Sequence, residues 1–262
     1  MKTLLIYDKL VTLHRDAHRH LRLDADAQQP FSFARETNSV LLAAAELPQA
    51  ALDFPCVFIE TAGHHTLAAL VGLRDRENLF VDGESRWARG SYVPAFIRRY
   101  PFVLAEDESQ PQEFTVCVDQ AYGGLNTETG QPLFDESGHE SPWLQQVMQF
   151  LVDFRQEMTA TRELADALAE AQLLQPRSIE YTLAGEGQKK TLGGFKVVDE
   201  DRLRALPAET LQLWLQRGWL GLIYAHLLSL NQVQRLALRL DQRLAAAGAA
   251  APLDAAVSGP LH

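Results

Sequence analysis

The sequence lacks the features that would place it in a membrane or in an oxidising compartment. Its 262 residues include only two cysteines, Cys56 and Cys117, which lie far apart, each in an apolar run, so no disulfide scaffold is predicted. The longest apolar stretch, residues 219–230, has about 12 residues, whereas a membrane-spanning helix needs about 20. The apolar run at the N-terminus is too short for a signal peptide. These absences predict a cytoplasmic protein with reduced cysteines and no membrane insertion.

Positive charge is also scarce. The chain has 24 lysines and arginines against 34 aspartates and glutamates, which gives a formal net charge of −10. An acidic surface repels phosphate backbones and anionic lipids. We therefore expect no nucleic-acid partner, although a local basic patch is compatible with this composition.

Motifs that identify common enzymes and metal sites are missing. The sequence has no GxGxxG after a predicted strand, no P-loop, no GxSxG and no HExxH. The cysteines and histidines do not have the spacing of a structural zinc site. We expect neither a metal nor a cofactor. The missing motifs favour a protein that is not an enzyme, but they do not exclude an enzyme of another class.

Two polar segments contain residue patterns that can bind metal ions. His14 and Asp16 have the His-x-Asp form of an iron triad, but their segment is predicted to be an exposed helix or turn and not the end of a strand, so a solvated polar segment explains it better. His14 and His18 have a spacing that can bind metal on a helix, but the neighbouring arginines oppose a cation, so a basic surface patch is the better interpretation. The loop at 132–140 clusters acids with His139 and resembles a Ca²⁺ or Mg²⁺ ligand set. It lacks the EF-hand pattern, so a solvated acidic loop is the simpler interpretation.

Hydrophobic patterning predicts an α+β protein with a strand-rich first part, residues 1–140. A short helix interrupted at Pro48 is predicted within residues 39–52, and residues 120–142 are predicted to form one long loop. Runs of β-forming residues predict strands at 54–59, 67–73, 79–81 and 114–119.

The second part, residues 141–246, is predicted to be helical and to form one compact unit with the first. Ser141 and Pro142 begin a helix that runs to about Leu173, and Pro176 stops it. Asp199 is predicted to cap a short helix. Further segments are predicted as follows: a β-hairpin near 178–198 around the turn 185–187, helices at 208–217 and 219–246 interrupted near Gly218, and a disordered tail at 247–262.

The strongest candidate site is the segment from Tyr92 to Phe102, bounded internally by Pro94 and Pro101. Arginines beside aromatic rings suit planar anions and peptide carboxylates. The alternative is that the aromatic residues belong to the core and the arginines pair with acids such as Glu106 or Asp107. The predicted ligand-binding residues of the segment are Tyr92, Phe96, Arg98, Arg99, Tyr100 and Phe102.

His226 is the remaining predicted ligand-binding residue. It lies in an almost wholly apolar helical stretch, where a lone histidine is more often a core residue with satisfied hydrogen bonds than a ligand. If the protein is an enzyme, His226 or His139 would serve as its acid or base.

Several strings occur in unbroken order along residues 5–240. They are Thr37-Asn38-Ser39, Ala45-Glu46-Leu47-Pro48, Gly72-Leu73-Arg74, Glu77-Asn78-Leu79-Phe80-Val81-Asp82, Tyr92-Val93-Pro94-Ala95-Phe96-Ile97-Arg98-Arg99-Tyr100-Pro101-Phe102, Pro132-Leu133-Phe134-Asp135, Leu192-Gly193-Gly194-Phe195-Lys196-Val197-Val198-Asp199-Glu200 and Ile223-Tyr224-Ala225-His226-Leu227-Leu228-Ser229-Leu230. Together they resemble the bacterial SapC family, which is named after a surface-layer locus.

The resemblance implies a cytoplasmic SapC-like protein with a link to surface-layer or envelope processes, and it supplies no catalytic residue. Our first functional hypothesis is a non-catalytic accessory factor that binds a peptide or a partner protein. The alternative is an enzyme of unrecognised class that acts on an anionic small molecule or peptide. The oligomeric state is not predicted.

Overall fold

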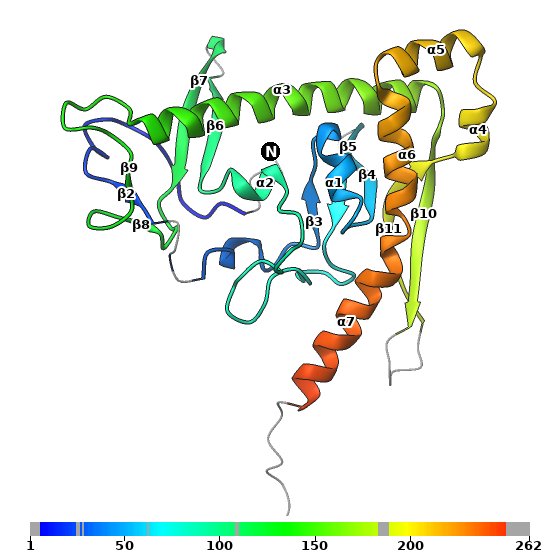
Figure 1. The fold of residues 1–262 in the computed structure, drawn as a ribbon, viewed down its shortest axis with the longest axis horizontal. Helices are drawn as coiled ribbons and strands as arrows, with labels where there is room; N and C mark the ends of the chain where they lie inside the picture. Colours follow the sequence, from blue (N-terminus) through cyan, green and yellow to red (C-terminus); the bar gives the residue numbers. More distant parts are fainter. Residues whose placement is uncertain are drawn as a thin grey trace, which may run out of the picture.

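A computed structural model describes residues 6–24, 27, 29–61, 63–107, 110–182 and 189–249. Within these ranges the chain has the predicted α+β class, with antiparallel strands mostly in the first part and helices mostly in the second (Figure 1). The long helix α3 (Pro142–Glu170) runs across the molecule, and the sheets lie along it (Figure 1).

The largest sheet has five antiparallel strands in the order β10–β11–β4–β5–β3. Strand β11 joins β4 through the pairs Phe195 with Ile59 and Lys196 with Phe58. The two parts of the sequence therefore share this sheet. The bounds of its strands in chain order are β3 Ser39–Leu41, β4 Cys56–Thr61, β5 His64–Leu70, β10 Leu174–Thr182 and β11 Lys189–Val198.

The predicted hairpin is confirmed as β10 and β11, and its turn at 183–188 lies outside the described residues. The prediction that Pro176 stops a helix is wrong. Helix α3 already ends at Glu170, and Pro176 lies within β10. Because β10 is at the sheet edge, only one neighbouring strand, β11, could be affected by the missing N–H of the proline.

Six further strands form two three-stranded sheets, ordered β1–β7–β6 and β8–β2–β9. The segment predicted as one long loop contributes β8 and β9, which pair with β2 on either side. Strands of two residues are too short to give a periodic signal. The bounds are β1 Leu10–Thr12, β2 Arg22–Leu23, β6 Phe102–Asp107, β7 Gln110–Asp119, β8 Leu125–Asn126 and β9 Gln131–Pro132.

The strand predicted at 79–81 is wrong, because Val81 makes only an isolated bridge with Trp87. The buried side chain of Asn78 provides the physical reason. It donates to the carbonyl oxygen of Ala34 at 3.0 Å and accepts the N–H of Phe80 at 2.9 Å. These bonds hold the backbone in a local turn instead of a strand ladder.

The helix predicted within 39–52 is shorter than expected. After β3 the chain forms a 3₁₀ turn, η2 (Ala44–Glu46), and then α1 (Leu47–Ala50). Pro48 lies in the first turn of α1, where its missing N–H would have no helical partner in any case. It therefore starts the helix rather than interrupting it. A second 3₁₀ turn, η1, spans Ser32–Ala34.

Both predicted helix caps are confirmed. The Ser141 hydroxyl accepts the N–H of Leu144 at 3.1 Å at the start of α3. The Asp199 carboxylate accepts the N–H groups of Asp201 and Arg202, each at 3.1 Å, and begins α4 (Glu200–Arg204). Each cap satisfies N–H groups that have no partner in the first turn of a helix.

Three further helices follow, α5 (Ala208–Gln216), α6 (Trp219–Ser229) and α7 (Gln232–Ala249). Gly218 separates α5 from α6 in a left-handed conformation, φ 72°, as the predicted interruption requires. A second break after Ser229, not predicted, divides the long C-terminal helix. Residues 247–249 of the predicted tail belong to α7, and residues 250–262 lie outside the described ranges.

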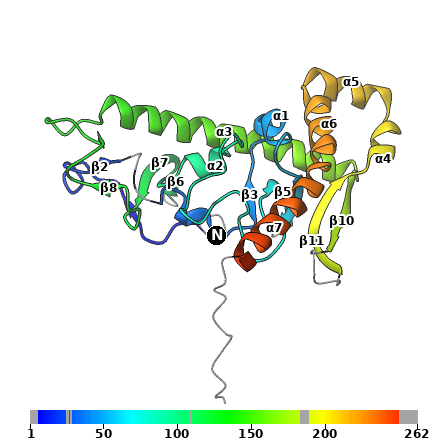
Figure 2. The same cartoon turned by 60° about the horizontal axis from the view of Figure 1, so that its bottom comes forward.

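Helix α6 lies on β4 and β11, and α7 follows it along the molecule (Figure 2). Buried apolar side chains form two clusters, and α3 joins them: Leu151 belongs to the smaller, whereas Phe154 and Leu168 belong to the larger. Among the described residues, no helix combines the length and the apolar character needed to cross a lipid bilayer.

Candidate functional site

The predicted aromatic–arginine segment forms a short helix, α2 (Ala95–Arg98), between extended stretches, as its prolines predict. Pro94 precedes the first helical residue, and Pro101 leads into β6. The segment lies beside α3 in Figure 1. Two of its side chains, Arg98 and Arg99, contact rings of that helix, those of Phe150 and Phe154.

The aromatic side chains of the segment are largely structural. Phe96 and Phe102 are buried. The Tyr92 and Tyr100 rings are partly buried, and their hydroxyls donate to the carboxylates of Glu46 at 2.9 Å and Asp119 at 3.1 Å. Burial raises the pKa of Tyr92 to about 12, and the Glu46 charge adds to the effect. These rings position the segment, as the core alternative supposes.

Asp119 holds the backbone of this region together by hydrogen bonds, and no pattern in the sequence predicted this role. Its fully buried carboxylate accepts three backbone N–H groups, those of Asp8 at 2.8 Å, Lys9 at 2.9 Å and Ala121 at 3.0 Å. Burial alone would raise its pKa, but these bonds and the one from Tyr100 outweigh it, so the pKa is lowered.

The two arginines have different surroundings. Arg98 is exposed, its Nε donates to the carbonyl oxygen of Val93 at 3.1 Å, and its guanidinium lies 5.2 Å from the centre of the Phe150 ring on α3. Arg99 points into the protein and is 9% exposed. Adjacent residues of a helix point about 100° apart, which accounts for the difference.

Arg99 is enclosed by aromatic rings. Its guanidinium lies 4.3 Å from the ring centre of Phe96, 5.3 Å from that of Phe154 and 5.8 Å from that of Tyr7. Its Nε and Nη2 atoms are buried and have no hydrogen-bond partner. Burial lowers the pKa of Arg99, and burial also raises the pKa of Tyr7 to about 12.

A third arginine belongs to the same region. Arg155 is exposed on α3, directly after Phe154, and its guanidinium lies 3.6 Å from the ring centre of Phe114 on β7. No sequence pattern links two residues 41 positions apart, so this pair was missed. We call these three arginines and the rings of Phe114, Phe150 and Phe154 the arginine–aromatic cluster.

The charge of the cluster is not neutralised within the described part of the chain. Arg98, Arg99 and Arg155 take part in no ion pair with any side chain that the structure describes there. The side chains of Glu106 and Asp107, the acids considered as partners, lie outside that description. A guanidinium on a ring keeps its N–H edges available for a carboxylate.

His226 lies apart from the cluster. It is fully buried, its Nε2 accepts the N–H of Val198 at 3.1 Å, and its Nδ1 is 2.8 Å from the carbonyl oxygen of Cys56, to which it donates. Burial lowers its pKa to about 4. The ring thus connects α6 with β4 and β11. Since both nitrogens are occupied, we leave His226 out of the proposed site.

No group of three or more His, Cys, Asp or Glu side chains among the described residues could hold a metal ion. His14 and His139 are exposed and lie near acids of their own segments: His14 Nδ1 is 3.8 Å from the Asp16 carboxylate, and His139 Nδ1 is 3.6 Å from that of Asp135.

Comparison with known proteins agrees with the resemblance carried by the sequence strings. No curated protein and no solved structure matches the chain. The model of the SapC family matches residues 13–236 of the 262. The chain belongs to the SapC family.

Proposed function

We propose that this protein is a non-catalytic binding protein that recognises an acidic segment of a peptide or of a partner protein. The observation that carries the proposal is the arginine–aromatic cluster, where three guanidiniums lie on aromatic rings without an ion pair among the described side chains. Carboxylates are the complementary groups, because they accept two parallel hydrogen bonds from one guanidinium.

The three arginines have different roles in the proposed site. Arg98 and Arg155 reach solvent and would contact the ligand, while the rings beneath them limit their motion and so reduce the entropy lost on binding. Arg99 lies beneath the surface and adds a fixed positive charge. Since the whole chain carries a net charge of −10, an acidic partner would be repelled elsewhere and accepted at this cluster.

A cytoplasmic location and a role in surface-layer or envelope processes are parts of the proposal that rest on the sequence and on the family's name. The partner in that setting would be a protein with an exposed acidic stretch.

Selection from a random-sequence peptide display library tests the proposal. The full chain serves as target, and the double variant Arg98→Ala, Arg155→Ala serves for counter-selection. We expect the enriched peptides to be rich in Asp and Glu. Synthetic copies should bind about tenfold more weakly to each single variant, which corresponds to the loss of about 1.4 kcal/mol.

Arg162→Ala provides the matched control, because Arg162 is exposed on the same helix and belongs to no aromatic contact found in the described residues. It should leave peptide affinity unchanged. Circular dichroism and melting temperature establish that each variant is folded. Enriched peptides without an excess of acids, or equal binding by the double variant, would contradict the proposal.

A further inference from the structure

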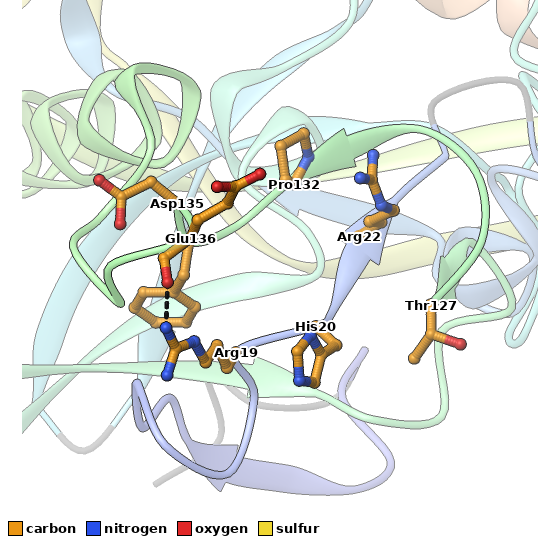
Figure 3. Close-up of a pocket in the computed structure, with 8 residues that line it drawn as sticks. Arg19, His20, Arg22, Thr127, Pro132, Asp135 and Glu136 are labelled. Atoms are coloured by element: carbon orange, nitrogen blue, oxygen red, sulfur yellow. Dashed lines mark hydrogen bonds between the residues drawn. The ribbon is translucent and has the colours of Figure 1, made fainter.

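A cavity at the sheet formed by β8, β2 and β9 is a second candidate ligand site. This cavity of about 380 Å³ lies between the segment leading into β2 and the loop around β9 (Figure 3). Arg19, Arg22, Asp135 and Glu136 line it, and Phe134 forms part of its wall. The volume falls near the lower end of the range for small-molecule sites, about 300–1,000 Å³.

Strand pairing brings the basic segment and the acidic loop together, although more than 100 residues separate them. Strand β2 pairs with both β8 and β9. Gly130 allows this close approach: its φ is +90°, and a Cβ there would lie 2.2 Å from the carbonyl oxygen of Leu23. Arg22 Nη1 donates to the carbonyl oxygen of Gly130 at 3.0 Å, and Arg19 Nη2 donates to that of Glu136.

These hydrogen bonds hold both arginines by backbone oxygens instead of carboxylates. Within the described ranges neither Arg19 nor Arg22 forms an ion pair, although two acids line the same cavity. Their remaining N–H groups are available to a ligand.

The two acids are not paired with these arginines either. Asp135 accepts the N–H groups of Ser137 and His139, each at 2.8 Å, and these bonds, that of His139 foremost, hold its pKa below the usual value. The carboxylate of Glu136 has no hydrogen bond or ion pair with any residue that the structure describes. Both signs of charge therefore line one cavity without neutralising each other.

We propose that this cavity binds a zwitterionic group, an ammonium and a carboxylate a few bonds apart. The carboxylate would accept N–H groups of Arg22, and the ammonium would lie against Glu136. Figure 3 draws the charged groups of Arg19 and Asp135 toward the other end of the cavity, away from Arg22. A ligand with negative charge alone is repelled by the two acids, and one with positive charge alone by the two arginines. Free amino acids and the ends of short peptides share this chemistry.

Saturation-transfer NMR and titration calorimetry on the full chain test the proposal. The probes are glycine, β-alanine, 4-aminobutanoate, 6-aminohexanoate and diglycine, with butanoate and butylamine as controls that carry one charge each. At least one zwitterion should bind about tenfold more tightly than either control, the effect of one additional charge-assisted contact. Tighter binding of diglycine than of glycine would indicate a peptide end, and the reverse a free amino acid; both support the zwitterion site.

Two charge-removing variants locate the site. Glu136→Gln keeps the side-chain shape in an exposed loop and should weaken the best zwitterion about tenfold, and Arg22→Gln should do the same from the other side. Glu163→Gln and Arg162→Gln, on an exposed face of α3, are the matched controls and should change nothing.

Melting temperatures accompany each titration. The Arg22→Gln variant loses the hydrogen bond to Gly130 and could unfold. Glu136→Gln then tests the proposal by itself, because the Glu136 carboxylate makes no hydrogen bond or ion pair with a described residue and its loss should leave the fold intact. Three results would overturn the proposal: no binding by any zwitterion, binding of butanoate or butylamine as tight as that of the best zwitterion, or unchanged affinity in the Glu136→Gln variant.

Discussion

The guanidinium of Arg99 lies 4.3 Å from the centre of the Phe96 ring, with two of its nitrogens buried and without hydrogen-bond partners. The negative face of an aromatic ring compensates a buried cation only in part, by about 2 kcal/mol when the contact is desolvated. Removing the cation from water costs several kcal/mol. The buried charge of Arg99 therefore lowers the stability of the folded protein.

Arg99→Met is expected to leave the free energy of unfolding unchanged or to raise it, by up to about 4 kcal/mol, because it keeps the packing and removes the unpaired charge. Arg99→Ala removes the packing as well and should lower it by about 2–4 kcal/mol. Urea unfolding measures both. If Arg99→Met destabilised the protein as much as Arg99→Ala, the buried charge itself would be stabilising, contrary to this argument.

His226 is expected to make stability depend on pH. Burial lowers its folded pKa to about 4, whereas an unfolded imidazole titrates near 6.5. The unfolded chain therefore binds the proton first as pH falls. The contribution is fully present above about pH 6.5 and is lost toward pH 4, and about 2 kcal/mol should disappear between about pH 7.5 and pH 5.

His226→Gln isolates this effect, because an amide can both donate to Cys56 and accept from Val198 as the ring does. Urea unfolding of the two proteins at both pH values gives the comparison. The wild type should lose more stability than the variant, since carboxylates titrate in both. Equal losses would show that His226 does not cause the pH dependence.

Asp119→Asn should destabilise the protein by about 2–4 kcal/mol, because a buried amide cannot accept all the hydrogen bonds that the carboxylate now receives. Its depressed pKa adds a stability term that is present above the unfolded value, near pH 4, and is lost as pH falls below it. Thermal and urea unfolding measure the loss. Asp75→Asn, at an exposed position, is the control and should have no effect; a similar effect of both would contradict the assigned role.

The thiols should differ in reactivity. Cys56 is fully buried, and burial raises its pKa to about 12, whereas Cys117 is partly buried; both are free. A chromogenic disulfide reagent should therefore label Cys56 only after unfolding, and Cys117 sooner. Mass spectrometry of labelled peptides distinguishes the two. Equal labelling rates in the folded protein, or an intramolecular disulfide, would contradict the expectation.

Local signals in the sequence determined the elements that depend on neighbouring residues. The Ser141 cap and the apolar stripe predicted α3, Asp199 predicted α4, and runs of β-forming residues predicted β4, β5 and β7. Caps and periodicity act within a few residues, so they can be recognised without a fold. The same signals wrongly predicted a strand at residues 79–81. There Asn78 donates a hydrogen bond to the distant carbonyl oxygen of Ala34, which favours a turn.

The candidate sites depend on contacts that no local pattern contains. Arg98 and Arg99 were both named as ligand-binding residues, and their adjacent positions on a helix predict different surroundings, but only the packing of α2 on α3 decides that Arg98 is exposed and Arg99 is buried. Arg155, which follows Phe154 on α3, lies over the Phe114 ring of β7, a contact that only the fold creates. Sequence alone determined the α+β class, the acidic character and the arginine–aromatic segment. Tertiary structure decided which charges remain without partners, because burial and pairing of a side chain depend on residues that come close only when the chain has folded.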